Sequence, residues 1–247
     1  MRNLRSNPDT IRRWTTGGVL CLAAVLMIGA LFVDPGTWGD DREAVSYQDN
    51  PALAQLQSAM YHFAYLLMAI AVLGLAHFTR LRATLAGHVT AGLAAIGWIN
   101  LSALLLTDPI AWWFGARHPA EEAERLTDEM LELPNVIFGF MIPGPFLALG
   151  GTALLLVVLW RAGFVHWLAP LMFAAWCAGS FVVPYGPAAI PLWLAGAGVL
   201  TYLGVRILRM GDDVYAAYYR PRPAPVVETA AHAEPALPPE QQVTADA

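Results

Sequence analysis

Long apolar runs dominate the chain, and polar residues collect between them. Six runs stand out, at positions 14–33, 54–78, 84–107, 135–160, 164–183 and 188–208. Each has about the 20 apolar residues that a helix needs to cross the hydrocarbon core of a bilayer. No charged side chain lies near the middle of a run, where a charge would be costly. Backbone groups in lipid must hydrogen-bond within their own segment. The pattern therefore predicts an all-α, polytopic membrane protein with six transmembrane helices in one bundle over positions 14–210.

The arginines set the predicted orientation of this bundle. All 14 basic residues are Arg. If residues 1–13 are cytoplasmic, only three arginines fall on outer segments, namely Arg42, Arg117 and Arg125. The other eleven then lie on inner segments, so the positive-inside rule predicts that both termini are cytoplasmic. We therefore expect a protein of the bacterial plasma membrane whose first partner is the lipid bilayer.

Composition and charge narrow the class of protein further. Hydrophobic residues make up 57% of the 247 positions and charged residues only 13%, and the mean hydropathy is +0.50. Soluble domains carry about 25% charged residues, so a water-soluble globule is not expected. The formal net charge of −5 removes the basic surface that nucleic-acid binding requires. Cys21 and Cys177 both lie in apolar runs and form neither a disulfide framework nor a CxxC motif.

The two long outer segments, 34–53 and 108–134, are acidic. Together they hold twelve acidic residues against three arginines. Pro119 and the glutamates that follow it predict a short amphipathic helix along or over the outer end of the bundle. The segment 211–247 mixes Pro with Ala, Glu and Gln and is predicted to be a disordered cytoplasmic tail. The outer loops and this tail are the expected contact sites for protein partners.

One candidate site centres on His62 in the second run. Asn100 lies as far after the turn around Leu81 as His62 lies before it, so antiparallel helices would place both side chains at similar depth. In one interpretation they line a small polar pocket, open to the outside, where His62 exchanges a proton. In the other, an interhelical hydrogen bond simply holds the two helices together. Further candidates for the pocket are Ser102, Asp108, Asp34, and Pro143, Gly144 and Pro145, which should kink the fourth helix.

A second candidate site consists of His77, His88 and His166, near the inner ends of three runs. Imidazoles at one level could bind a metal ion, or two of them could ligate a b-type haem. The alternative is that they are ordinary histidines at the headgroup level beside the inner arginines. No cofactor is predicted from the motifs.

A short pattern within residues 150–179 carries a resemblance. An apolar helix ends in Leu159, Arg161 and Gly163, spaced as Leu-x-Arg-x-Gly, and a turn and Trp167 lead into the next apolar helix. This pattern resembles one seen in uncharacterised six-helix bacterial integral-membrane proteins of unknown function. The resemblance covers about 30 residues. It implies a six-helix membrane fold and, because those families have no assigned chemistry, no activity.

These patterns favour a non-enzymatic function. The sequence has no G-x-S-x-G, Walker A, G-x-G-x-x-G or HExxH motif. We therefore expect an accessory, sensory or scaffolding membrane component. One alternative is a small-solute or lipid permease that uses the His62 and Asn100 pocket. Another is a redox protein that holds a haem or metal at the inner histidines.

Overall fold

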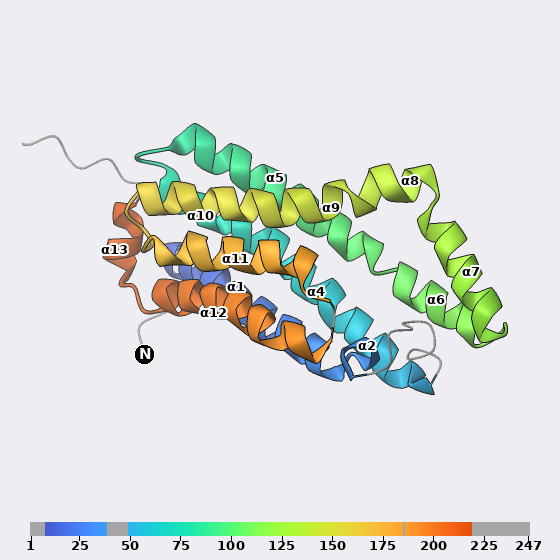
Figure 1. Ribbon diagram of the computed structural model, residues 1–247. Helices are drawn as coiled ribbons and strands as arrows, with labels where there is room; N and C mark the ends of the chain where they lie inside the picture. Colours follow the sequence, from blue (N-terminus) through green and yellow to red (C-terminus); the bar gives the residue numbers. More distant parts are fainter. Residues whose placement is uncertain (1–7, 39–48, 185, 219–247) are drawn as a thin grey trace, which may run out of the picture.

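The computed structural model describes residues 8–38, 49–184 and 186–218 (Figure 1). Every regular element within these ranges is a helix. The long helices run side by side in alternating directions, and in chain order they are α1 (Pro8–Val33), α4 (Pro51–Leu75), α5 (Thr84–Leu104), α10 (Gly151–Arg161), α11 (Leu168–Val182) and α12 (Ile190–Leu208). The all-α bundle expected from the apolar runs is therefore present.

Five predicted spans are confirmed as helices long and apolar enough to cross a membrane. With their continuations they are Pro8–Val33, Pro51–Thr79, Thr84–Gly115, Pro134–Arg161 and Pro187–Leu208. The run predicted at 164–183 is helical only over α11, whose 15 residues cover about 22 Å, against about 30 Å for a hydrocarbon core. The helix ends early because Val183, which precedes Pro184, is extended, as residues before proline prefer to be.

The two ends of the bundle differ in charge. At the end that holds the start of α1, the turn after η1 (Ala76–Thr79) and α13 (Asp212–Ala217), the described residues include Arg12, Arg13, Arg80, Arg82, Arg161, Arg206 and Arg209 (Figure 1). We call this the arginine end. The opposite end is formed by α2 (Pro35–Trp38), α6 (Thr107–Gly115) and α7 (Ala120–Leu131), and we call it the acidic end. The short helix expected after Pro119 is α7.

The sharp turn between α10 and α11 explains the Leu-x-Arg-x-Gly pattern. Gly163 has a φ of +80°, a conformation that costs other residues energy. The N–H of Phe164 donates to Leu159 O at 2.9 Å, and the N–H of Gly163 donates to Trp160 O at 2.9 Å. These two bonds are those of a Schellman cap, with the accompanying apolar contact supplied by the buried side chains of Leu159 and Phe164.

Small residues let α5 and the fourth span approach closely. A Cβ atom at Gly97 would overlap the backbone nitrogen of Ala148, and one at Gly151 would lie 2.7 Å from the backbone nitrogen of Ala94. The Nε1 atom of Trp98 donates to Thr152 Oγ1 across this contact, at 3.0 Å. The middle of the bundle is therefore tightly packed.

The fourth span is irregular where the kink was expected. The helical path passes through α8 (Pro134–Val136), the π-helical η2 (Ile137–Met141), α9 (Pro143–Pro145) and the π-helical η3 (Phe146–Gly150) before α10 begins. Proline has no N–H to donate to the carbonyl four residues earlier, so the ordinary α-helical pattern is interrupted here.

The predicted disordered tail needs a correction at its start. Asp212–Ala217 form helix α13, which packs against α1. The Nε atom of Arg13 donates to Asp212 Oδ1 at 3.0 Å, and Thr10 Oγ1 donates to Asp212 Oδ2 at 2.5 Å. These bonds and the burial of Tyr215 offset the conformational entropy that is lost when the segment becomes ordered. Residues 219–247 of the predicted tail, and residues 39–48 of the first outer loop, lie outside the described residues.

Candidate functional site

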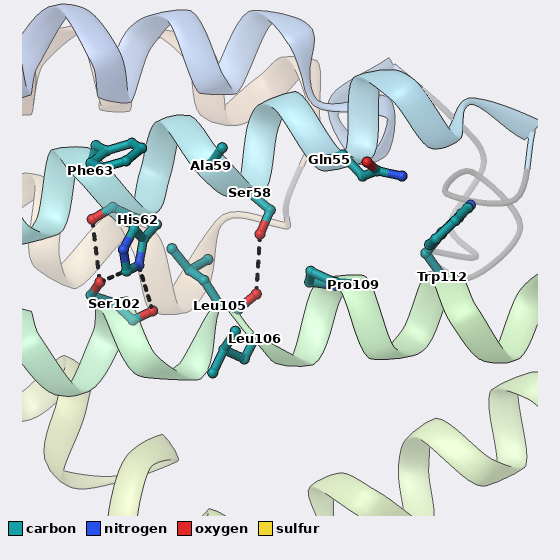
Figure 2. A pocket seen from close by; sticks show the side chains of 10 residues that line it. All are labelled: Gln55, Ser58, Ala59, His62, Phe63, Ser102, Leu105, Leu106, Pro109 and Trp112. Atoms are coloured by element: carbon teal, nitrogen blue, oxygen red, sulfur yellow. Dashed lines mark hydrogen bonds between the residues drawn. The ribbon is translucent and has the colours of Figure 1, made fainter.

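A groove of about 480 Å³ lies at the acidic end, between α4 and the α5–α6 segment (Figure 2). Its walls consist of two facing rows of side chains, one from each helix. They are Gln55, Ser58, Ala59, His62 and Phe63 on α4, and Ser102, Leu105, Leu106, Pro109 and Trp112 on α5–α6. Residues three or four apart share a helix face, and these spacings place each row on a single face.

His62 and Ser102 form the polar end of the groove. Ser102 Oγ lies 2.8 Å from His62 Nδ1 and donates to the His62 carbonyl oxygen at 3.3 Å (Figure 2). Ser102 is only 2% exposed, whereas His62 is half-buried and borders the groove. Ser58 Oγ donates to the carbonyl oxygen of Leu105 at 3.2 Å, one turn nearer the acidic end. The two helices are therefore joined by hydrogen bonds along the groove.

Asn100 does not join His62, which corrects the predicted pairing. Its Nδ2 atom donates to Gly139 O in the fourth span, at 3.2 Å. Pro143 has no N–H with which to bond that carbonyl, so Asn100 satisfies a backbone acceptor beside the prolines. Asn100 and Ser102 are separated by about 200° around an α-helix, so both cannot face His62.

The two predicted aspartates also lie outside the groove lining. Asp34 is 2% exposed, and its Oδ1 accepts from the N–H of Gly36 at 2.8 Å, which caps α2. Its Oδ2 accepts from Gln57 Nε2 at 3.0 Å, which ties the end of α1 to α4. Asp108 does not border the groove, although Pro109 does. Asp34 therefore has a structural role at the junction of α1, α2 and α4.

The Pro143, Gly144 and Pro145 segment packs on the far side of α5 from the groove. A Cβ atom at Gly144 would lie 3.5 Å from Leu101 N. None of the three residues borders the groove. The predicted contribution of this irregular segment to the pocket is therefore not found.

The groove does not continue inward past His62. Tyr65 follows His62 by three residues and Trp98 precedes Ser102 by four, so both lie one turn further into the bundle. Their ring centroids are 5.3 Å apart, and Trp98 is 1% exposed. Neither of these two residues borders the groove, so the groove lining ends at the level of His62, Phe63 and Ser102.

The three inner histidines do not form one cluster: His77 and His88 both border a cavity at the arginine end, whereas His166 does not. His77 is buried, with its ring stacked on Tyr215 at a centroid distance of 4.5 Å. His88 Nδ1 donates to the carbonyl of Thr84 at 2.7 Å, and His166 lies on the separate turn between α10 and α11. Among the described residues there is no group of three or more His, Cys, Asp or Glu side chains placed to hold a metal ion.

Sequence reasoning missed most of the groove. Gln55, Ser58 and Trp112 were not expected there, yet Gln55 and Ser58 lie seven and four residues before His62, on its helix face. That spacing was a usable signal. Comparisons with protein families, with curated proteins and with solved structures find no match to this chain. The resemblance of residues 150–179 to six-helix membrane proteins therefore stays a prediction.

Proposed function

We propose that this chain is a six-span protein of the bacterial plasma membrane, with both termini cytoplasmic, that binds a small amphipathic ligand in the groove. In this proposal it is a sensory or accessory component rather than an enzyme. The orientation is supported by the arginines gathered at one end of the bundle. In addition to the five long apolar helices, we assign α11 as a membrane span. It follows α10 and precedes α12 in the chain, and the three helices alternate in direction as the other long helices do (Figure 1).

The observation that carries the functional proposal is that the groove lining ends at the level of His62 and Ser102. A permease needs a route across the bundle, whereas the residues one turn further in, Tyr65 and Trp98, pack together and with the buried core. A groove whose lining stops partway along the bundle suits a protein that binds a molecule and reports its presence. The alternative of a permease is therefore less well supported than a sensory function.

The lining indicates the chemistry of the ligand. At about 480 Å³ the groove falls within the roughly 300–1,000 Å³ of small-molecule sites. Phe63, Leu106 and Trp112 offer apolar contact, and His62 and Gln55 offer hydrogen bonds. No acidic or basic side chain other than His62 borders the groove within the described residues. These features favour an apolar or aromatic body with one neutral hydrogen-bonding group.

The accessibility of the groove tests the proposal. In a background with Cys21 and Cys177 replaced by Ser, Gln55→Cys and Ala59→Cys in intact cells should react with a membrane-impermeant methanethiosulfonate. Thr15→Cys, at the arginine end, should react only after the cells are permeabilised. The reverse result would refute the orientation.

A flux measurement separates binding from permeation. Proteoliposomes should shrink and recover in glycerol or urea at the rate of protein-free liposomes, because the groove lining does not extend past His62 and Ser102 into the packed core. Faster recovery that is lost in His62→Leu would favour the permease instead.

A further inference from the structure

We propose that a second cavity, at the arginine end, binds the phosphate group of an anionic phospholipid. This cavity has a volume of about 370 Å³ and is bordered by residues of α1, α4, η1, α5 and α13. It lies at the opposite end of α4 from the groove, so it is independent of the proposed ligand site (Figure 1).

Arginine and histidine side chains from separate elements border the cavity. Arg12 comes from α1, Arg80 follows η1, and the imidazole of His88 comes from α5. Asp9 approaches Arg12 at 3.9 Å, at the loose limit of an ion pair. A guanidinium has five N–H donors, so this contact leaves donors for a phosphate oxygen. Two arginines that border one cavity supply the positive charge and the N–H donors that a phosphate group requires.

The neighbouring arginine is used differently, which distinguishes a binding role from a structural one. Arg13 donates to Asp212 Oδ1 at 3.0 Å and to the carbonyl of Leu208 at 2.6 Å. These bonds hold α13 in place, and α13 carries the Tyr215 wall of the cavity. Of these two adjacent residues of α1, Arg13 therefore holds the helix that carries the Tyr215 wall, and Arg12 supplies positive charge to the cavity.

Hydroxyl groups and buried aromatic rings form the other walls of the cavity near the arginines. Thr15 and Thr16 of α1 border the cavity, and their hydroxyl groups can donate hydrogen bonds. The stacked rings of His77 and Tyr215 form a buried wall; Tyr215 is 2% exposed. A headgroup would therefore meet donors on one side and a rigid aromatic surface on another.

The remaining wall favours a lipid over a free phosphate ion. Ile11, Ile70 and Leu73 also border the cavity, and each is more than half exposed on the outside of the bundle. In a bilayer these side chains would contact acyl chains. A ligand with a phosphate head and an apolar tail fits both parts of the cavity, as lipids do in basic pockets between membrane helices.

Native mass spectrometry of the full chain in detergent tests this site, with phosphatidylglycerol and phosphatidylcholine as probes. The double variant Arg12→Gln with Arg80→Gln should weaken phosphatidylglycerol binding by about tenfold or more, because both removed guanidinium groups border the cavity. The matched control is Arg161→Gln with Arg209→Gln, which removes the same charge from exposed positions at the same end. This control should change binding less than about twofold.

Two further measurements guard against a general charge effect. Leu73→Trp keeps every charge but fills the apolar wall, so it should also weaken phosphatidylglycerol binding. Equal losses in the two double variants, or no preference for phosphatidylglycerol over phosphatidylcholine, would overturn the proposal. Displacement of the lipid by inorganic phosphate would assign the cavity to the free ion and also overturn it.

Discussion

The two cavities lie at opposite ends of the same helix, α4, and differ in almost every chemical respect. The groove at the acidic end is bordered by neutral side chains and by His62, which is hydrogen-bonded to Ser102. The cavity at the arginine end is bordered by Arg12 and Arg80 and opens beside exposed aliphatic side chains. The helix α4 contributes the polar residues Gln55, Ser58 and His62 to the groove but only apolar residues and Gly74 to the cavity, whose arginines come from other elements.

A packed layer separates the two cavities. Small residues such as Ala64, Ala91 and Ala94 are fully buried there, together with Met68. Because this layer excludes space for water or solute, the two ends are expected to bind independently. Three predictions test whether the layer and each cavity are built as described.

The largest effect on stability is expected from Gly97→Ala, which introduces a methyl group into the packed layer. The added methyl group would overlap the backbone of Ala148, which cannot move aside as a flexible side chain could. We expect a loss of about 3 kcal/mol of unfolding free energy. Gly92→Ala is the matched control on the same helix, because nothing lies within 4 Å of its added Cβ. Thermal unfolding in detergent, followed by circular dichroism, compares them; equal melting temperatures would mean that the layer is loose.

A smaller effect is expected from Arg13→Ala, which removes the support of the inner cavity wall. Its side chain is 11% exposed and that of Asp212 is 35% exposed, so the pair is partly shielded from water. Loss of the charged hydrogen bonds should cost about 2 kcal/mol and release α13. Limited proteolysis should then cut near Asp212 faster than in the wild type. Arg209→Ala should leave this rate unchanged, and faster cutting in both variants would contradict the specific role of Arg13.

The smallest effect is expected at the groove, from the His62 and Ser102 pair. A double-mutant cycle with His62→Leu and Ser102→Ala should give a coupling energy of about 0.6 kcal/mol, typical of hydrogen bonds inside membrane proteins. Denaturation of the four proteins in mixed micelles measures it. A coupling energy indistinguishable from zero would show that the two side chains are not bonded in the folded protein.

Hydropathy predicts five spans well because crossing a membrane imposes a minimum apolar length. It fails for the length of α11, because counting apolar residues takes no account of backbone geometry. Gly163 sets a turn before this helix and Pro184 ends it, although the residues on both sides are apolar. The order at Asp212–Ala217 was missed for another reason: it depends on Arg13 and Thr10, about 200 residues away in sequence.

The candidate site was predicted in part. Distance from the turn around Leu81 gives the depth of a residue, and on this basis His62 was placed at the groove. Depth does not give direction around the helix axis, so Asn100 was chosen as the partner although Ser102 contacts His62. His77 and His88 of the inner cavity are among the predicted inner histidines, but the cavity itself was not predicted, because its arginines come from segments that only the folded bundle brings together.

The Schellman cap at Gly163 also bears on how kinship between membrane proteins is judged. A third to a half of helices end in a left-handed residue, usually glycine, and an arginine there is favoured by the positive-inside rule. Chains of separate ancestry can therefore arrive at Leu-x-Arg-x-Gly independently, driven by stereochemistry and membrane orientation. Shared descent is better sought in features that no local rule dictates, such as the hydrogen bond from Asn100 to the carbonyl of Gly139 near Pro143.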